Sequence, residues 1–383
     1  MRRFKTTFLV SVFILSLLSL LMGGMAYGDV SIVGKWGYGV LEHWNNGQWG
    51  SSSGTFVFNS NGTGTDTYKS NDGGILTSKT KNFTYSTTNN QDGSINLTMI
   101  YADGTDTFKV VGSDDGKMFI TDGTADTSRQ THMVGIKLDT SKTYSNADLN
   151  GEYYLIGYEN NANSIAPPNG NGSHMAISSI VTFDGNGSYT YYGTANSDGT
   201  IWFDDESSHV KTYSVNQDGS ILIEGACDGY LSGDSKIFSL SCPQIADQWV
   251  SYFGMKKGDK IYSTSDIAGT WAIAGFGDDY GTSFNAEFGS MTCDSGGNCI
   301  FLGKNQRDGN VKYETVNDSV SVAPDGSFGS SVNPGSPYYA GAIGNNGNTI
   351  IFNVSFNSSE LYHRGIFIGV RCSSCSNLVK LLG

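Results

Sequence analysis

The feature that most constrains the fold is a threefold repeat. Three segments open with one pattern, in which a glycine precedes an aromatic residue by two positions: Ile32 to Trp36, Leu149 to Tyr153, and Ile267 to Trp271. Their glycines, Gly34, Gly151 and Gly269, lie 117 and 118 residues apart. The chain therefore contains three copies of one unit, because chance does not place several landmarks at one period.

The ends and midpoints of the units repeat in the same order. Each unit closes on an apolar residue, a glycine, an apolar residue and a basic residue, the last being Lys137, Lys256 or Arg371. An Asp-Gly turn followed by serine marks each midpoint, at Asp92, Asp218 and Asp325. These landmarks divide the chain into units at residues 29–143, 144–261 and 262–383.

Each unit is predicted to be a set of short antiparallel strands. The first unit divides at its turns into eight strands, 34–43, 54–59, 63–69, 82–88, 94–100, 106–111, 117–121 and 131–138. Trp36, Tyr38 and Val40 share one face of the opening strand, which should point into a core. The composition is typical of many short strands joined by tight turns, since the chain has 51 glycines, 21 tyrosines and 20 phenylalanines but only 6 prolines.

The predicted fold class is all-β, with three tandem eight-stranded antiparallel up-and-down barrels, because closure removes exposed strand edges. A β-propeller of six four-stranded blades, or another sandwich, is the alternative. A single outer-membrane barrel needs strands of about 9–11 residues with an apolar outer face. The polar alternate positions here argue against that barrel.

The opening pattern resembles that of the lipocalins and the wider calycin family. Their Gly-x-Trp appears as Gly34-Lys35-Trp36 and Gly269-Thr270-Trp271, with Gly151-Glu152-Tyr153 as an aromatic variant. The resemblance covers the two ends of each unit, and the family's Thr-Asp-Tyr motif has no counterpart. It implies a barrel that binds small apolar molecules. It also implies that Lys137, Lys256 and Arg371 pack over the aromatic rings by cation–π contact. The repeat is also similar to those of uncharacterised exported bacterial proteins.

The N-terminus predicts export. Residues 1–28 have a basic start, an apolar run from Phe8 to about Met22, and small residues at Ala26 and Gly28, which is the plan of a cleaved signal peptide. We expect a periplasmic, cell-surface or extracellular protein without a membrane span after cleavage. The net charge of −13 becomes about −16 without these residues, and an acidic surface disfavours nucleic acid as a partner.

The six cysteines occur in even numbers per unit, which favours disulfides in an exported chain. Cys227 with Cys242, and Cys293 with Cys299, are predicted pairs. Cys372 and Cys375 form a CxxC near the C-terminus. A redox role for this CxxC, or a zinc site made by the four cysteines of the third unit, remains an alternative.

The loops after the opening strands supply the candidate ligand-binding residues. Trp44 and Trp49 flank a Gly/Asn loop and are candidates to stack on a sugar or an apolar ligand. Tyr158, just before the second loop, and Tyr280, in the third, are the other two candidates. The alternative is that the tryptophans cover the end of the barrel.

No sequence motif indicates catalysis, a cofactor or a metal. The five histidines form no cluster with metal-ligand spacing, and the common nucleophile, zinc and phosphate-loop motifs are absent from the sequence. We therefore expect a non-catalytic binding protein for a small apolar molecule or glycan, with no cofactor. The alternatives are a structural or surface-interaction repeat protein without a ligand and, third, an enzyme.

Overall fold

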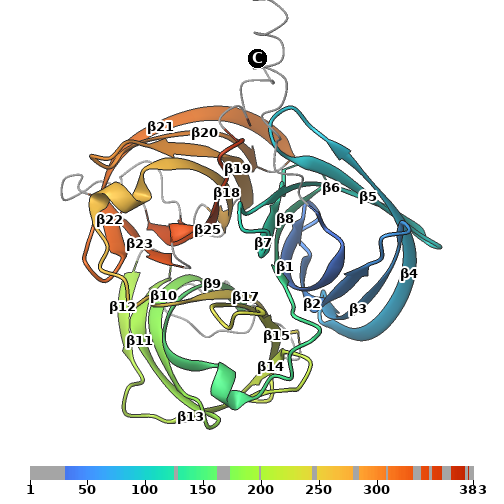
Figure 1. Ribbon diagram of the computed structural model, residues 1–383, viewed down its shortest axis with the longest axis horizontal. Helices are drawn as coiled ribbons and strands as arrows, with labels where there is room; N and C mark the ends of the chain where they lie inside the picture. The colour runs from blue at the N-terminus through green and yellow to red at the C-terminus, as the bar shows by residue number, and fades with distance from the viewer. Residues whose placement is uncertain are drawn as a thin grey trace, which may run out of the picture.

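The computed structural model describes residues 31–124, 128–161, 173–197, 200–243, 248–278, 284–307, 309–330, 338–344, 347–355, 364–375 and 378. The predicted signal peptide and Tyr280 lie outside these ranges. Three closed antiparallel barrels, one per repeat, make up the fold (Figure 1). The predicted all-β class and eight-stranded barrels are confirmed, and the propeller alternative is wrong. None of the described residues belongs to a helix that is long and apolar enough to cross a membrane.

The first barrel is a simple ring in which each strand pairs with the next and the last returns to the first. Its strands are β1 (Gly34–Trp44), β2 (Trp49–Phe58), β3 (Thr63–Asp72), β4 (Ile75–Asn89), β5 (Ile95–Tyr101), β6 (Gly104–Gly112), β7 (Met118–Thr121) and β8 (Arg129–Lys137). β1 and β8 close the ring in a register that places Trp36 opposite Lys137.

The second barrel has the same plan with a divided fourth strand. It contains the 3-10 helix η1 (Asn146–Asp148) and strands β9 (Asn150–Asn161), β10 (Ser173–Asp184), β11 (Ser188–Ser197), β12 (Thr200–Asp205), β13 (Lys211–Val215), β14 (Ser220–Ile223), β15 (Cys227–Leu231), β16 (Ile237–Ser241) and β17 (Gln248–Lys256). β12 and β13 pair with different parts of β11, so together they occupy the place of one strand. β17 closes the ring on β9.

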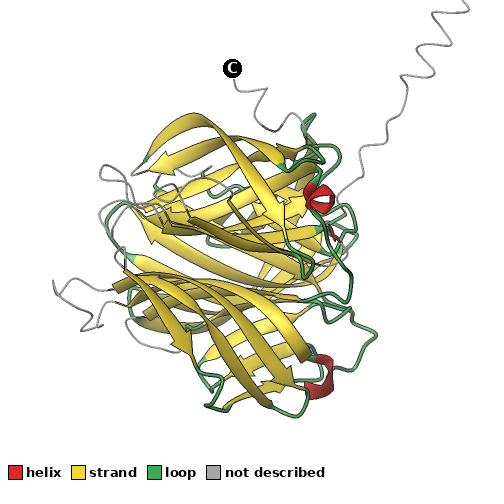
Figure 2. Ribbon diagram, turned by 90° about the vertical axis from the view of Figure 1, so that its left-hand side faces the viewer, coloured by secondary structure: helices red, strands yellow, loops and turns green. Residues whose placement is uncertain are grey.

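The third barrel repeats the order of the first. It comprises the 3-10 helix η2 (Thr264–Ile267), β18 (Gly269–Asp278), β19 (Phe284–Cys293), β20 (Asn298–Arg307), β21 (Asn310–Val322), β22 (Ser327–Ser330), β23 (Tyr338–Gly344), β24 (Thr349–Ser355) and β25 (Arg364–Arg371). η1 and η2 lie on the same side of the molecule (Figure 2).

A basic residue covers the opening aromatic ring in every barrel, as the family resemblance implied. The Lys137 ammonium lies 5.3 Å from the centre of the Trp36 ring, and the Lys256 ammonium lies 5.7 Å from that of Tyr153. The Arg371 guanidinium lies 4.3 Å from the Trp271 ring. These contacts confirm the cation–π prediction.

The three barrels pack side by side around one shared centre (Figure 1). Alternation along the strands separates two sets of side chains, with Trp36 and Tyr38 inside the first barrel and Leu41 outside it. The outward sets of all three barrels meet in one cluster, here called the central core. It comprises Leu41, Trp49, Val111, Met118, Ile120, Val134, Ile136, Tyr154, Ile156, Tyr158, Ile237, Trp249, Phe253, Met255, Ala272, Ala274, Phe276, Phe284, Phe288, Ala342, Ile351, Ile366, Ile368, Val370, Cys372, Cys375 and Leu378.

Glycines on the outward face of β1 allow the second barrel to approach closely. A Cβ atom at Gly37 would lie 2.3 Å from the Cβ of Tyr230, and one at Gly39 would lie 2.6 Å from the Ser239 hydroxyl. A Cβ atom at Gly37 would overlap the base of the Tyr230 side chain, and one at Gly39 would force the Ser239 hydroxyl to move, so glycine at both positions lets the two barrels pack closely. The repeats therefore form one packed body rather than a string of spacers.

Candidate functional site

The third barrel encloses a cavity of about 350 Å³. Its apolar lining comprises Ile267, Ile273, Met291, Phe301, Val316, Val320, Phe328, Phe352, Val354 and Phe367 together with the Cys299 sulfur. Its polar lining comprises Asn285, Glu287, Asn305, Arg307, Lys312, Glu314 and Asp318. The cavity thus combines a large apolar wall with a small number of polar groups, which is typical of small-molecule sites.

Strand register shows how the interiors of the first and third barrels differ. Phe58 pairs with Gly34, and Cys293 pairs with the equivalent Gly269. Residues that pair with one another on neighbouring strands form one layer of the barrel. In the first barrel the layer that contains Phe58 continues through Gly64 to Phe83. The matching layer of the third barrel is Cys293, Cys299 and Asp318. Two phenyl rings, 5.4 Å apart in the first barrel, are thus replaced by a disulfide and a carboxylate.

A second layer also differs between the first and third barrels. In the first barrel Tyr68 lies opposite Gly54 and packs against the barrel interior. The matching residues of the third barrel are Gly303 and Gly289, which lie opposite each other. The third barrel therefore carries no side chain of its own at these two positions, and the ring of Phe301 lies over Gly303 instead.

Aromatic side chains fill the second barrel as they fill the first. Phe183 occupies the place of Phe58, since it pairs with Gly151. The ring centre of Phe183 lies 5.5 Å from that of Tyr153, 5.0 Å from Tyr213 and 5.8 Å from Phe238. Among the described residues, the layer through Cys293, Cys299 and Asp318 in the third barrel lacks the large rings that the matching layers of the other two barrels contain.

The cavity changes in polarity along the barrel. The 3-10 helix η2 covers the end of the barrel where Trp271 lies. Its first residue, Thr264, accepts a hydrogen bond from the Val322 amide at 3.2 Å, and its last residue, Ile267, lines the cavity. At this η2 end the layer formed by Cys293, Cys299 and Asp318 borders apolar side chains. The far end is polar, because Glu287, Asn305 and Lys312 lie in one layer and Arg307 lies in the next. The Asn305 amide donates to Glu287 at 3.0 Å.

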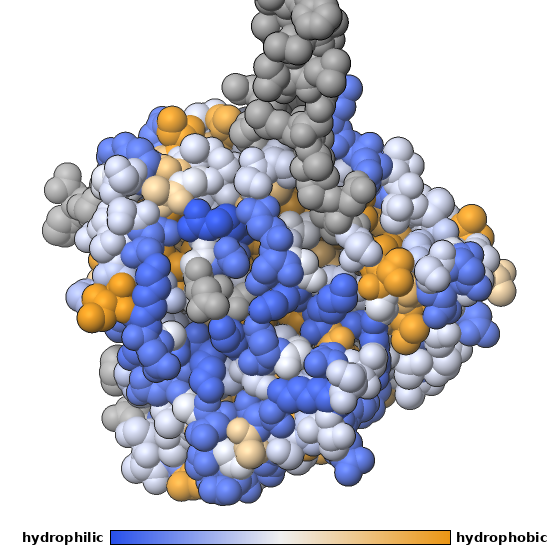
Figure 3. Space-filling view, in the orientation of Figure 1, coloured by the Kyte–Doolittle hydropathy of each residue, from blue (hydrophilic) through white to orange (hydrophobic). Residues whose placement is uncertain are grey.

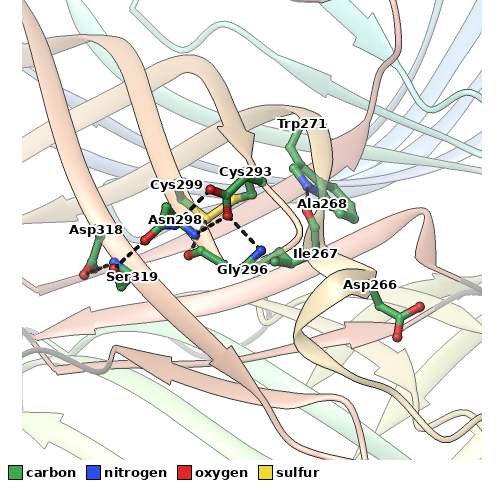
Figure 4. Close-up of a disulfide and its surroundings, with 12 residues drawn as sticks. Asp266, Ile267, Ala268, Trp271, Cys293, Gly296, Asn298, Cys299, Asp318 and Ser319 are labelled. Carbon is green, nitrogen blue, oxygen red and sulfur yellow. Dashed lines mark hydrogen bonds between the residues drawn. A yellow bond between two sulfur atoms is a disulfide. The ribbon is translucent and has the colours of Figure 1, made fainter.

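The disulfides confirm both predicted cysteine pairs. Cys227 bonds to Cys242, and Cys293 bonds to Cys299 across the β19–β20 hairpin (Figure 4). Cys299 belongs to the cavity lining. Cys372 and Cys375 form a third disulfide, which lies in the central core. The four cysteines of the third unit are thus paired in two separate bonds, so the four-cysteine zinc alternative is wrong.

The structure places the predicted ligand-binding residues away from this cavity. Trp49 is 6% exposed and Tyr158 is fully buried, both within the central core, and their stacked rings lie 6.1 Å apart. The Tyr158 hydroxyl donates to the carboxylate of Asp278. Trp44 ends β1 and is half-buried, with its ring against Gly50. Tyr280 lies outside the described residues.

The sequence interpretation missed the cavity residues because it looked for binding groups in the loops. The signal lies instead on inward-facing strand positions. With the repeats aligned on Gly34 and Gly269, Phe58 corresponds to Cys293, Phe83 to Asp318, and Tyr68 to Gly303. Loss of large rings at several inward positions of one repeat indicates a cavity there.

The first barrel buries a carboxylic acid among aromatic side chains, at the position that corresponds to Phe301 of the third barrel. Asp66 of β3 is 7% exposed and faces inward. The Tyr38 hydroxyl donates to its Oδ1 at 2.8 Å, and the Tyr101 hydroxyl lies 3.5 Å from its Oδ2. Burial raises the pKa of Asp66 to about 6, because desolvation of the charged form outweighs the hydrogen bond from Tyr38.

The Asp66→Asn substitution is expected to make the protein more stable above pH 7 by about 3 kcal/mol, because the folded pKa of Asp66 is raised from 3.8 to about 6 and each pKa unit corresponds to about 1.4 kcal/mol. The folded pKa exceeds the unfolded value of about 3.9, so the native state binds this proton more tightly. The associated stability is present below pH 4 and is lost as pH rises through about 6. Urea unfolding of both proteins at pH 4 and pH 8 checks this: the stability difference should appear only at pH 8.

Comparing the two proteins at each pH isolates Asp66 from other titrating groups. One such group is His132, which is 1% exposed and whose pKa burial lowers to about 4. A stability difference that is equal at both pH values would contradict the titration of Asp66.

Comparison with known proteins identifies no family. No protein-family model and no curated protein matches the sequence. Similar solved structures include a protein of unknown function from the DUF3598 family of Nostoc punctiforme, at 10% identity over 58% of this chain and 96% of that chain, with a TM-score of 0.21. Kievitone hydratase from Nectria haematococca has 8% identity over 90% of both chains and a TM-score of 0.21. Isotype 1 transferrin binding protein B from Neisseria meningitidis has 11% identity over 84% of this chain and 65% of that chain, with a TM-score of 0.23. At these TM-scores the likenesses carry no argument about function.

Proposed function

We propose that the protein is an exported, non-catalytic binding protein that holds a small molecule with an apolar body in the cavity of its third barrel. The observation that carries the proposal is the difference between repeats: positions that hold large rings in the first barrel hold Cys293, Asp318 and Gly303 in the third. The volume of about 350 Å³ lies within the range of small-molecule sites. The lipocalin-like ends of each unit agree with this role.

Export is part of the same proposal. The predicted signal peptide at residues 1–28 and three disulfides are typical of a chain that matures outside the reducing cytosol. Hydrophilic side chains cover most of the face seen in Figure 3, and apolar residues show there only in small separate groups. That surface suits a protein that carries its apolar ligand inside.

The test is binding of N-phenyl-1-naphthylamine, a neutral dye whose fluorescence rises in an apolar site. The unsubstituted protein is expected to bind one dye molecule saturably. The double variant Met291→Phe and Val316→Phe, which adds two rings to the cavity lining, should weaken dye binding at least about tenfold. Titration of dye fluorescence measures both affinities.

The matched control adds a ring outside the cavity. Ile300 lies on β20 and is 48% exposed, so Ile300→Phe should leave dye affinity unchanged. Absence of saturable binding to the unsubstituted protein, or equal affinity in the double variant, would favour the alternative of an interaction protein without a small-molecule ligand.

A further inference from the structure

His132 lies on the outward face of the first barrel, where that barrel meets the third. It pairs with Leu41 across β1 and β8, and both Leu41 and Val134, the next outward residue of β8, belong to the central core. β8 contacts β18 and β19 of the third barrel. On the neighbouring strand β1, the ring centre of His43 lies 4.1 Å from that of Phe284 in β19. The imidazole of His132 therefore belongs to the contact between the two barrels.

This imidazole is buried without a hydrogen bond. The residue is 1% exposed, and in the described part of the chain neither ring nitrogen of His132 has a hydrogen-bond partner. A charged imidazolium in the same place would bury a positive charge and two N–H donors that lack acceptors. Burial accordingly lowers the pKa of His132 to about 4. The folded protein thus holds this side chain in its neutral form at neutral pH.

The ionisable groups on the strands packed against β8 have partners of their own. Asp122, just beyond the end of β7, forms an ion pair with Lys304 of β20, with 2.5 Å between oxygen and nitrogen. Asp278, on the outward face of β18, accepts a hydrogen bond from Tyr158. His43 of β1 forms a hydrogen bond within the first barrel. The other outward residues of these strands in the third and second barrels are uncharged: Ala272, Ala274 and Phe276 of β18, Phe284, Ala286 and Phe288 of β19, and Ile237, Ser239 and Ser241 of β16.

We propose that His132 makes the contact between the first and third barrels sensitive to acid, so that protonation of its ring loosens β8 from β18 and β19. This inference concerns a conformational change and goes beyond the proposed function. An opened contact exposes the imidazole to water, where its pKa is about 6.5. Acid favours the opened form, because that form binds the proton more tightly than the closed one. The closed contact keeps its full stability above about pH 6.5 and loses stability as pH falls towards 4.

The test is hydrogen–deuterium exchange of the backbone amides, followed by mass spectrometry at pH 8 and pH 5. His132→Phe keeps a ring at the contact and removes the titrating nitrogens. Between the two pH values the unsubstituted protein should lose about thirtyfold more protection than this variant in β8, β18 and β19. That factor follows from a pKa of about 4 in the closed contact and about 6.5 in the opened one. Comparing the two proteins at each pH removes the effect of pH on intrinsic exchange.

Two further variants control the comparison. His132→Leu removes the same nitrogens with a smaller side chain that does not overfill the contact, and it should behave as His132→Phe does. His209→Gln removes a histidine whose side chain is 71% exposed, so it should keep the acid response of the unsubstituted protein. Circular dichroism at pH 8 shows that each variant is folded.

The distribution of exchange separates a loosened contact from general unfolding. β13 and β14 lie in the second barrel, on the side away from the third (Figure 1), and should keep equal protection in the unsubstituted protein and the His132 variants. An acid response that is the same with and without His132, or one that is equally strong in β13 and β14, overturns the inference. Titration of the histidine rings by nuclear magnetic resonance needs no variant: a pKa near 6.5 for His132 in the folded protein also overturns it.

Discussion

Replacing Trp271 by alanine is expected to lower the free energy of unfolding by about 3–5 kcal/mol, the range found for large aromatic truncations in cores. The Trp271 side chain is fully buried, and its indole N–H donates to the Ile267 carbonyl at 2.8 Å. Arg371 covers the ring and donates to the carbonyls of Asp266 and Ala268 at 2.8 and 2.7 Å. The substitution thus opens a void and loosens the contacts that hold η2. Guanidinium unfolding followed by circular dichroism measures the loss.

Two further variants control this prediction. Trp271→Phe keeps a ring for packing and for the cation–π contact but removes the hydrogen bond, so its loss of stability should be smaller. Trp36→Ala should match Trp271→Ala, because Trp36 is 1% exposed and donates to the Ile32 carbonyl at 2.6 Å. Unchanged unfolding of the alanine variants would contradict the inward placement of both tryptophans.

Replacing Trp49 by alanine is expected to cost about 3–5 kcal/mol as well, although this residue starts a strand next to a loop. Its ring lies in the central core, 4.6 Å from the ring centre of Phe284, 5.9 Å from Phe276 and 6.1 Å from Tyr158. Its indole ring thus joins all three barrels. The loss should therefore lower the stability of the whole molecule, as measured by differential scanning calorimetry.

Trp44→Ala is the natural comparison, since the two tryptophans flank the same loop. Trp44 is only half-buried, so its truncation should cost about 1 kcal/mol or less. If Trp49→Ala were as mild as Trp44→Ala, Trp49 would not be a structural element of the central core.

Much of the fold is predictable from the sequence, because the inward alternation and the turn residues both repeat. The expected strand 34–43 matches β1, and 63–69 lies within β3. The expected strands 54–59 and 82–88 begin later than β2 and β4, which start at Trp49 and Ile75. A run of small residues near the start of β2 has the composition of a loop, yet barrel closure pairs it with β1 and β3. Tertiary pairing here overrides local propensity.

The packing of the barrels was not predicted, although the sequence carries a signal for it. In the opening strand of the third unit, Ala272, Ala274 and Phe276 are apolar, and so are the inward residues Trp271 and Ile273. A strand that is apolar on both faces is buried on both. Alternation alone shows only that one face is inside. It does not show which partner covers the other face.

The candidate site shows a similar limit. Cysteine parity and spacing are sufficient to predict two disulfides, because a bond requires only that two sulfurs meet. A cavity depends on what several inward residues on different strands leave unfilled. The absence of rings at Cys293, Gly303 and Asp318 becomes visible only when strand register places these three residues against Phe58, Tyr68 and Phe83.

Three repeats joined in one chain are free to differ where an assembly of identical subunits is not. His43, Asn160 and Asp278 occupy equivalent positions, since they pair respectively with Trp49, His174 and Phe284. All three are buried. A homotrimer of the third repeat would place three copies of the Asp278 carboxylate at this shared interface, where like charges repel one another. Covalent linkage lets one repeat carry the acid and another carry Tyr158 as its hydrogen-bond donor. The same freedom allows one barrel to exchange its packed interior for a cavity while its two neighbours keep theirs filled and hold the molecule together.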